Sequence, residues 1–441
     1  MARSKSPWPS LRATVVSLLG SGRLPLLSLS LILVVVVYFQ IVAVSRLGPK
    51  VQPFEGFGTL GEKEAQRVVQ EKKTEARKLP SSIGCPDSPR DVPADVIFSA
   101  RQWLKPWSSD IQDHPEKRFT ERTMDEFFAW LEQQGFGVAR IRVTNGMLSK
   151  PVMVKGRERE DSTYLQRVAR WYLLFDTLQR TRGLPSYLDL VVSTAITPLL
   201  PLSVPSLSRP PLFGYFAHEG FLDVPLPSFE LYGRLRKWRK NVVLAHPWIS
   251  RNPKVFWRGP PEGSGKGGEK EHWKNHPSAA MVRLGRKIPE AVDARFEDCR
   301  PVGCSEELWR KVYRNELTTE TNVSYSDYLR HRFVVATDTS SLESRFSYLL
   351  STMAVVLKPK SLTKEYFEEF LVPFVHFVPL EAQGGDWEER IKELQANVVR
   401  VSEISREATI AFEEHVVNDK WLDYAWALVS AYALLQQTEQ D

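Results

Sequence analysis

The sequence predicts an α/β protein whose strands and helices alternate twice over, behind a hydrophobic N-terminal segment. The clearest signal lies in 328–380, where a strand at 333–336 meets a polar turn and a helix that carries Arg345. A second strand, an acidic aromatic helix and a third strand follow at 353–357, 364–371 and 374–378. This order is typical of a parallel sheet, which binds anions beyond the carboxyl ends of its strands.

The N-terminal segment predicts a membrane anchor. Residues 24–44 carry no charge and are long enough to cross a bilayer as a helix. Basic residues precede them, so we expect a cytosolic tail at 1–23 and a lumenal body after a stem at 45–95. This describes a single-pass type II protein of the Golgi or endoplasmic reticulum membrane. A cleaved signal peptide is the alternative.

The first folded half is expected at 96–235. An amphipathic helix is predicted at 120–134, with Thr120 or Thr123 as its cap, and an alternating strand at 137–143 follows it. The next elements are a helix with apolar residues at helical spacing, a strand, a proline-rich loop and a short strand, at 163–181, 187–193, 198–211 and 212–216.

The second half is expected at 236–400. It opens with a basic helix around 234–240 and a strand at 254–257, and it contains 328–380. Helices at 401–441 are expected to pack back on the first half. The chain of 441 residues has a net charge of +6, but its positive charges gather only at 234–240, which is typical of a solvated helix face. We therefore predict no nucleic-acid partner.

The cysteines are too few for a zinc site or a disulfide framework. Cys299 and Cys304 could close a small loop in an oxidising lumen, which leaves Cys85 free or paired elsewhere. The sequon at Asn322 is compatible with a lumenal body as a glycosylation site. His218-Glu219 lacks the second histidine of a zinc helix, so no metal site is predicted.

Several motifs occur in an informative order. They are Trp257-Arg258-Gly259 at a strand end, Arg283 followed by Val292-Asp293-Ala294, Asp338 with its polar turn, Ser344-Arg345-Phe346, Lys358 and the segment 373–379. In this order they resemble glycosyltransferase family 90, which includes protein O-glucosyltransferases, capsule-associated xylosyltransferases and lipopolysaccharide-modifying enzymes. The resemblance covers residues from about 95 to 435.

The resemblance implies a GT-B arrangement of two Rossmann-like domains. The first half would bind a glycan or protein acceptor, and the second would bind UDP-glucose or UDP-xylose. Its donor-binding residues would be Arg258, Gly259, Arg283, Asp338, Ser344 and Arg345. Transfer would be a single inverting displacement, with Arg258 and Arg345 stabilising the leaving diphosphate. Such charge stabilisation requires no cofactor beyond the donor and can work without a metal.

The strand at 187–193 leads to the main departure from the family pattern. Ile196 stands where the family has the aspartate that removes the proton of the acceptor hydroxyl. Asp189, Glu219 and Asp223 are the nearby carboxylates that could replace it. Two alternatives remain: a different acceptor that uses another base, or a catalytically silent binding protein of the same fold. Thr339 and Glu343 also depart from the family pattern, in the turn after Asp338.

Overall fold

A computed structural model describes ten segments of the chain, which belong to one compact unit, Leu60–Asp441. The segments are 92–154, 162–195, 198–203, 209–229, 246–261, 272–302, 304–319, 323–337, 345–417 and 419–437. The expected tail, anchor and nearly all of the stem lie outside them, as does the basic helix at 234–240. Among the described residues, no helix is both long and apolar enough to cross a bilayer.

The first sheet has the strand order β2-β1-β4-β5-β7, and β3 also pairs with β1. The strands are β1 (Val138–Thr144), β2 (Met147–Leu148), β3 (Val152–Val154), β4 (Tyr187–Ser193), β5 (Leu212–Gly214) and β7 (Val224–Pro225). β4, β5 and β7 are parallel, whereas β1 runs antiparallel to β4. This half is therefore a mixed sheet and not a purely parallel one.

A tight turn after β1 reverses the chain and explains why β1 and β4 run antiparallel. Asn145 and Gly146 both have positive φ, 53° and 72°, which suits the two-residue hairpin that joins β1 to β2. The chain then returns along β1 as β3, and α6 (Ser162–Thr181) carries it across to β4. Alternating apolar residues predicted β1 and β4, but the direction of pairing depended on this turn.

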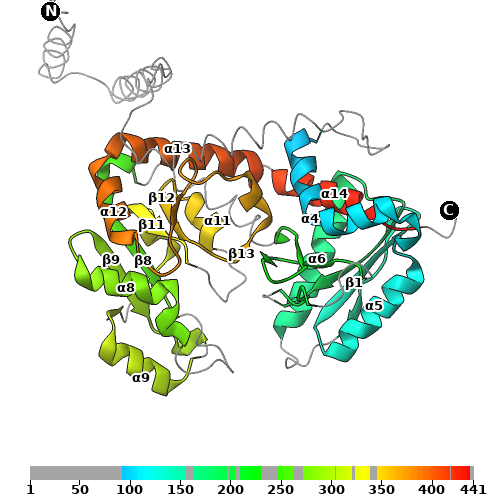
Figure 1. Cartoon of the computed structure of the whole chain (residues 1–441), viewed down its shortest axis with the longest axis horizontal. Helices are drawn as coiled ribbons and strands as arrows, with labels where there is room; N and C mark the ends of the chain where they lie inside the picture. The colour runs from blue at the N-terminus through cyan, green and yellow to red at the C-terminus, as the bar shows by residue number, and fades with distance from the viewer. Residues whose placement is uncertain are drawn as a thin grey trace, which may run out of the picture. The chain divides into compact units, whose positions relative to one another are not determined.

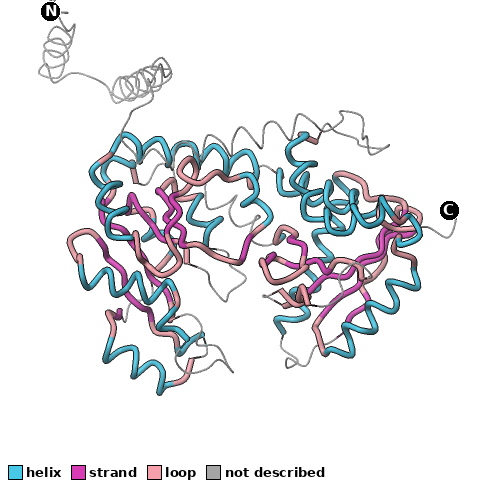
Figure 2. The backbone as a smooth tube through the Cα atoms, viewed as in Figure 1, coloured by secondary structure: helices cyan, strands magenta, loops and turns pink. Residues whose placement is uncertain are grey.

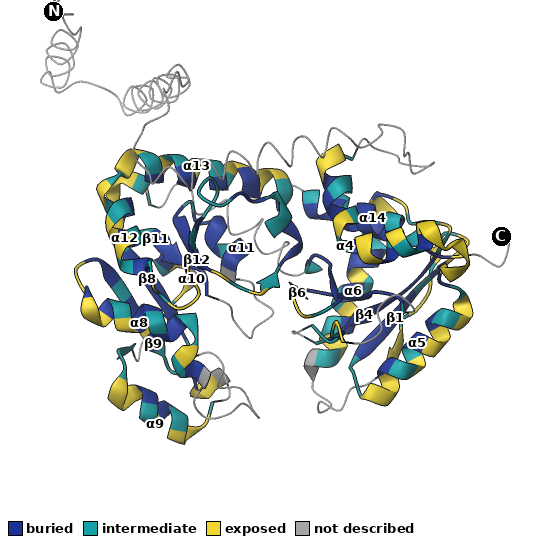
Figure 3. Cartoon of the chain, viewed as in Figure 1, coloured by how far each residue is buried: buried dark blue, intermediate teal, exposed yellow. Residues whose placement is uncertain are grey.

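Helices cover the first sheet. α5 (Glu121–Gln134) begins after Thr120, whose hydroxyl accepts the N–H of Thr123 at 3.2 Å, so the predicted cap is confirmed. α5 and α14 (Lys420–Ala433) pack against β4, and α4 (Ala94–Asp113) packs against α14 (Figure 1). The outer face of α5 is exposed, while the strands beneath it are buried (Figure 3).

The second sheet has the order β10-β9-β8-β11-β12-β14, and every pair in it is parallel, as predicted. The strands are β8 (Asn252–Gly259), β9 (Val292–Glu297), β10 (Thr318–Thr319), β11 (His331–Val335), β12 (Val355–Pro359) and β14 (Val378–Leu380). Its helices are α8 (Pro277–Lys287), α9 (Glu306–Asn315), α10 (Tyr325–Tyr328), α11 (Arg345–Leu350), α12 (Trp387–Ala396) and α13 (Val398–His415). Figure 2 shows the two sheets as separate groups of strands.

Two predicted elements in this half are wrong. The expected helix at 364–371 is a 3-10 helix, η5 (Tyr366–Phe370). The expected strand at 374–378 is mostly a turn in which the Phe374 N–H donates to the Phe377 carbonyl at 2.7 Å, and β14 begins only at Val378. Phe374 has a φ of 62°, a left-handed conformation that interrupts a strand.

The two halves are joined by a short strand pair and by the last helices. β6 (Ala217–His218) of the first half pairs antiparallel with β13 (Thr363–Lys364) of the second. α13 packs against β12, and α14 then packs against α4 and β4. The Tyr432 hydroxyl donates to the carbonyl of Asp189 at 3.1 Å, so the end of the chain is tied into the first sheet.

Candidate functional site

The carboxyl edge of the parallel sheet contains Arg258 and Gly259, the last two residues of β8. The Trp257 indole N–H donates to the Thr337 hydroxyl at 3.1 Å, which ties the end of β8 to the residues that follow β11. The Tyr328 hydroxyl donates to the Arg258 carbonyl at 2.8 Å and accepts the Arg258 N–H at 3.1 Å. These bonds fix the backbone at the end of β8.

The guanidinium of Arg258 is buried and held by Asp293 of β9. Its Nη1 donates to the Asp293 carbonyl and its Nη2 to the Asp293 carboxylate, both at 2.8 Å. Arg258 is 8% exposed, so the group is pre-oriented at the sheet edge. Part of its donor capacity is used within the protein, and Asp293 offsets its charge.

The structure describes the other predicted donor residues to different extents. Arg345 begins α11, but its side chain is not described, and Asp338 and Ser344 lie outside the described residues. Arg283 lies on α8 with 48% of its side chain exposed, and its Nη2 donates to the carbonyl of Lys274. None of its described contacts is shared with Arg258, and Arg283 remains a donor-site prediction from the family resemblance.

A cavity of about 490 Å³ lies at the ends of β12 and β14, and we call it the sheet-edge cavity. Its charged lining residues are Lys358, Lys360, Lys364 and Arg390, with Glu219, Glu368, Glu381 and Asp386. Lys358 pairs with Glu368 at 2.7 Å. No carboxylate in the described part of the chain pairs with Lys360 or Lys364, so both ammonium groups are available to an anion.

A second cavity, of about 290 Å³, adjoins the first, and we call it the α4 cavity. Trp103 and Trp107 of α4, His218 of β6 and Asp223 contribute to its lining. Glu219 and Lys364 line both cavities, so the α4 cavity and the sheet-edge cavity meet at the β6–β13 pair.

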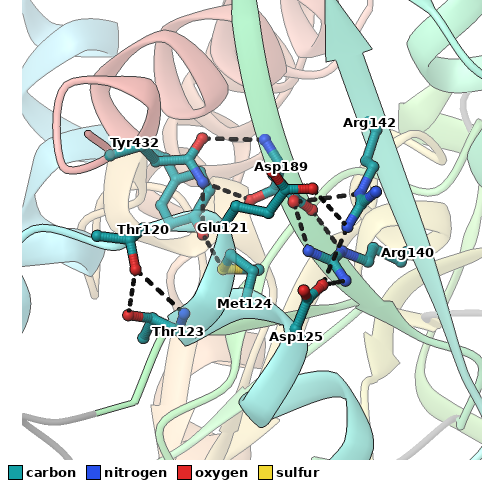
Figure 4. A network of polar contacts seen from close by, with 10 residues as sticks. Thr120, Glu121, Thr123, Met124, Asp125, Arg140, Arg142, Asp189 and Tyr432 are labelled. Atoms are coloured by element: carbon teal, nitrogen blue, oxygen red, sulfur yellow. Dashed lines mark hydrogen bonds and ion pairs between the residues drawn. The ribbon is translucent and has the colours of Figure 1, made fainter. Parts of the chain in front are cut away.

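Asp189, the first candidate base, is held in a buried ion-pair network on β4 (Figure 4). Arg140 of β1 donates to both of its carboxylate oxygens, at 2.7 and 2.6 Å, and Arg142 lies 3.3 Å from one of them. The Gln436 side chain also bonds the backbone of Asp189. A carboxylate that is 1% exposed and paired with two guanidinium groups cannot approach an acceptor, so Asp189 is a structural residue.

Asp223, the second candidate, is also buried, but no cation pairs with it in the described part of the chain. Its two oxygens accept the backbone N–H groups of Leu199 and Leu200 at 2.9 and 2.7 Å. Burial raises the pKa of Asp223 to about 6, although these hydrogen bonds act in the opposite direction. Asp223 therefore holds the chain just after Pro198, next to the predicted turn where Ile196 occupies the position at which the family resemblance implies an aspartate.

The near side of that turn is also held. The Thr194 N–H and hydroxyl donate to the Gly137 carbonyl at 3.0 and 2.8 Å, and Trp171 donates to the Ser193 carbonyl at 2.8 Å. Ile196 itself lies outside the described residues. Hydrogen bonds thus hold the chain on both sides of residue 196, and none of them involves the side chain of residue 196.

Glu219, the third candidate, is exposed. Its backbone N–H donates to the Leu362 carbonyl at 3.1 Å, which fixes it beside β13. It is the one candidate base that lines both cavities, so it lies where groups bound in the two halves would meet.

Cys299 and Cys304 are joined by a disulfide in this structure, with their Cα atoms 5.5 Å apart. Asn322 lies outside the described residues. Within the described segments, no three His, Cys, Asp or Glu side chains cluster as metal ligands would.

Some lining residues were missed by sequence reasoning. Trp103 and Trp107 lie in α4, where no motif marked a ligand site, and Lys360 and Lys364 follow β12 in a segment read only for its secondary structure. Asp293 stood in a recognised motif, but nothing in the sequence indicated that it would hold Arg258.

Comparison with known proteins identifies the family. The model of glycosyl transferase family 90 matches residues 163–441. Among curated relatives, protein O-glucosyltransferase 2 of Danio rerio is 23% identical over 238 residues, 52% of this chain and 44% of the relative. O-glucosyltransferase rumi of Drosophila melanogaster is 20% identical over 271 residues, 57% of this chain and 61% of the relative. The chain thus spans about half the length of these relatives.

A solved structure, that of Anabaena Alr3699/HepE in complex with UDP and glucose, covers 48% of this chain and 57% of its own. Its sequence identity is 10% and its TM-score 0.31, a level at which a shared fold does not follow. The family model, by contrast, matches well over half of the chain, including the whole of the parallel sheet. This chain belongs to glycosyl transferase family 90.

Proposed function

We propose that the protein transfers a sugar from a UDP-sugar to a hydroxyl group of a glycan or protein. Family membership and the fixed arginine at the carboxyl edge of the parallel sheet support this proposal. The names of the relatives favour glucose as the sugar, with xylose as the other candidate from the sequence motifs.

The donor would bind at the carboxyl edge of the second sheet. β8 and β12 are separated only by β11, so Arg258 and the sheet-edge cavity lie about two strand spacings, roughly 10 Å, apart. A diphosphate in the sheet-edge cavity would meet the ammonium groups of Lys360 and Lys364, and the guanidinium of Arg258 would add positive charge at the same edge of the sheet. Fixed positive charge stabilises the negative charge that develops on the leaving diphosphate. Arg345, Asp338, Ser344 and Gly259 remain donor-site predictions from the family resemblance.

Glu219 is the candidate base that the geometry favours. Its carboxylate would take the proton of the acceptor hydroxyl while the hydroxyl oxygen forms a bond to the anomeric carbon. The bond from that carbon to the diphosphate oxygen breaks, and UDP leaves with the electron pair. This single displacement inverts the anomeric configuration.

The cellular setting follows from the N-terminal sequence. We infer a type II protein of the Golgi or endoplasmic reticulum membrane, anchored by 24–44, with a lumenal body. The disulfide between Cys299 and Cys304 supports an oxidising compartment.

The test is UDP formation by the full-length chain from UDP-glucose or UDP-xylose, with water as the acceptor. Glu219→Gln should lower UDP formation at least 100-fold, because general base catalysis typically contributes 10²–10⁴. Glu414→Gln, at an exposed carboxylate of α13 that lines neither cavity, should leave the rate within twofold. Unchanged activity in Glu219→Gln would exclude Glu219 as the base.

The rival function is donor binding without catalysis, which Ile196 favours. Calorimetric measurement of UDP-sugar binding, combined with the assay of UDP formation, separates the two functions. A silent relative would bind a UDP-sugar without releasing UDP. In that case Ile196→Asp should raise UDP formation at least tenfold, since the chain on both sides of residue 196 is held in place. Absence of both binding and turnover would refute the proposed function.

A further inference from the structure

The α4 cavity has a wall that the family match does not include. Trp103 and Trp107 belong to α4 (Ala94–Asp113), whereas the match to the family begins at residue 163. The opposite wall is formed by β6 and by residues around β13. The cavity therefore combines the family's common fold with an N-terminal helix outside the matched residues.

The lining combines flat apolar surfaces with hydrogen-bonding groups. Trp103, Trp107 and Phe221 are aromatic, while His218, Glu219, Asp223, Lys364 and Glu369 are polar. Three carboxyl groups against one lysine make the cavity unfavourable for an anion. Rings that present an apolar face and a polar edge are suited to a ligand with the same two properties.

One ring nitrogen is available as a donor to such a ligand. The indole Nε1 of Trp103 is buried, so Trp103 offers the cavity its ring surface and not its N–H group. The Nδ1 of His218 accepts the Gly220 N–H at 3.0 Å, which leaves Nε2 as the protonated nitrogen of a neutral imidazole. A hydroxyl oxygen of the ligand could accept from this Nε2–H group.

The cavity is also connected to the proposed reaction site. Glu219 and Lys364 line it together with the sheet-edge cavity, and the β6–β13 pair holds them, with Lys364 opposite Ala217. A ligand in the α4 cavity would therefore lie beside Glu219, which also lines the proposed donor cavity.

We propose that the α4 cavity binds a neutral pyranose of the acceptor glycan, with its apolar face on Trp103. A pyranose carries C–H groups on its faces and hydroxyl groups around its rim, which matches the lining. A volume of about 290 Å³ is near the lower limit for ligand pockets, so it suits one ring and not an extended chain. This inference rests on the proposed glycosyl transfer and assigns its acceptor to the carbohydrate class.

Saturation-transfer NMR on the full-length chain, with methyl β-glucopyranoside and methyl β-xylopyranoside as probes, tests the proposal. We expect saturation of the ring C–H protons, and saturating UDP should not displace the probe. Trp103→Ala should weaken binding at least fivefold, whereas Trp103→Phe should keep most of the affinity.

Trp248→Ala is the matched control. Trp248 is also half-buried and also has a buried indole N–H without an acceptor in the described segments, but it lies in η2 (Trp248–Ser250) and lines neither cavity. Its loss should leave glycoside affinity unchanged. A thermal melt of each variant checks that the comparison is made on folded protein.

The outcomes are separable from those for the proposed function. No saturation transfer to either glycoside, equal losses in Trp103→Ala and Trp248→Ala, or displacement by UDP would each overturn the acceptor-site proposal. A chain that binds the glycosides as expected but releases no UDP would retain this site and refute transfer.

Discussion

Asp223 should make the protein less stable as the pH rises from 4.5 to 7.5. Burial raises its pKa from 3.8 to about 6, so the folded chain keeps a proton that the unfolded chain has mostly released at pH 4.5. Stability falls with pH wherever the folded state binds more protons, by about 1.4 kcal/mol per proton and pH unit. From pH 4.5 to 7.5 this amounts to about 2 kcal/mol, of which about 1.5 kcal/mol falls below pH 6.

Asp223→Asn isolates this contribution, because an amide does not titrate. The amide nitrogen of Asn would face one of the N–H groups of Leu199 and Leu200, so the variant should be less stable at every pH, by about 1–3 kcal/mol. The informative quantity is the difference between wild type and variant in the free energy of unfolding. That difference should be about 2 kcal/mol larger at pH 4.5 than at pH 7.5.

Urea denaturation at the two pH values, followed by far-UV circular dichroism, measures this difference in the free energy of unfolding. The other titrating groups contribute equally to the pH dependence of both proteins. Asp113→Asn removes an exposed carboxylate and controls for the loss of one charge. The reasoning would be refuted if the free energy of unfolding changed with pH to the same extent in wild type and in Asp223→Asn. It would also be refuted if the stability difference between wild type and Asp223→Asn were larger at pH 7.5 than at pH 4.5.

Two further substitutions test the packing around the site. Arg140→Ala should lower the free energy of unfolding by about 3–5 kcal/mol, because it leaves the Asp189 carboxylate buried without its main partner. The control is Arg122→Ala, which removes an exposed ion pair with Glu126 and should have no measurable effect in the same urea titration. Gly285→Val should cost about 1–3 kcal/mol, because a Cβ at Gly285 would already lie 3.3 Å from the backbone of Ala294 in β9. An unchanged melting temperature for Gly285→Val would show that α8 and β9 can separate without cost.

Periodicity predicted elements well where each element buries its own apolar face. The strand at 187–193 coincides with β4, and the helices at 120–134 and 163–181 differ from α5 and α6 by one residue. The same reasoning failed at 374–378, where apolar residues serve a turn with Phe374 in the left-handed region. A short apolar run reports burial and does not by itself report backbone conformation.

The candidate site was predicted less completely, because its chemistry depends on contacts between distant segments. The sequence identified Asp189, Glu219 and Asp223 as equivalent carboxylates. The structure separates them through Arg140, which lies 49 positions before Asp189, and through the pairing of β6 with β13. Arg283, another predicted donor residue, contacts Lys274 and Glu316 from α8, two partners that the sequence did not indicate.

The sequence by itself determined the parallel second sheet, the family and the presence of isoleucine at residue 196, since these depend on local patterns and on the identity of single residues. Only the tertiary structure decided that β1 opposes β4, that Asp189 is locked in an ion pair and that Trp103 shares a cavity with His218 and Lys364. The physical reason is that hydrophobic periodicity specifies which face of each element is buried. It does not specify which distant side chains meet once α4, β6 and β13 have packed together.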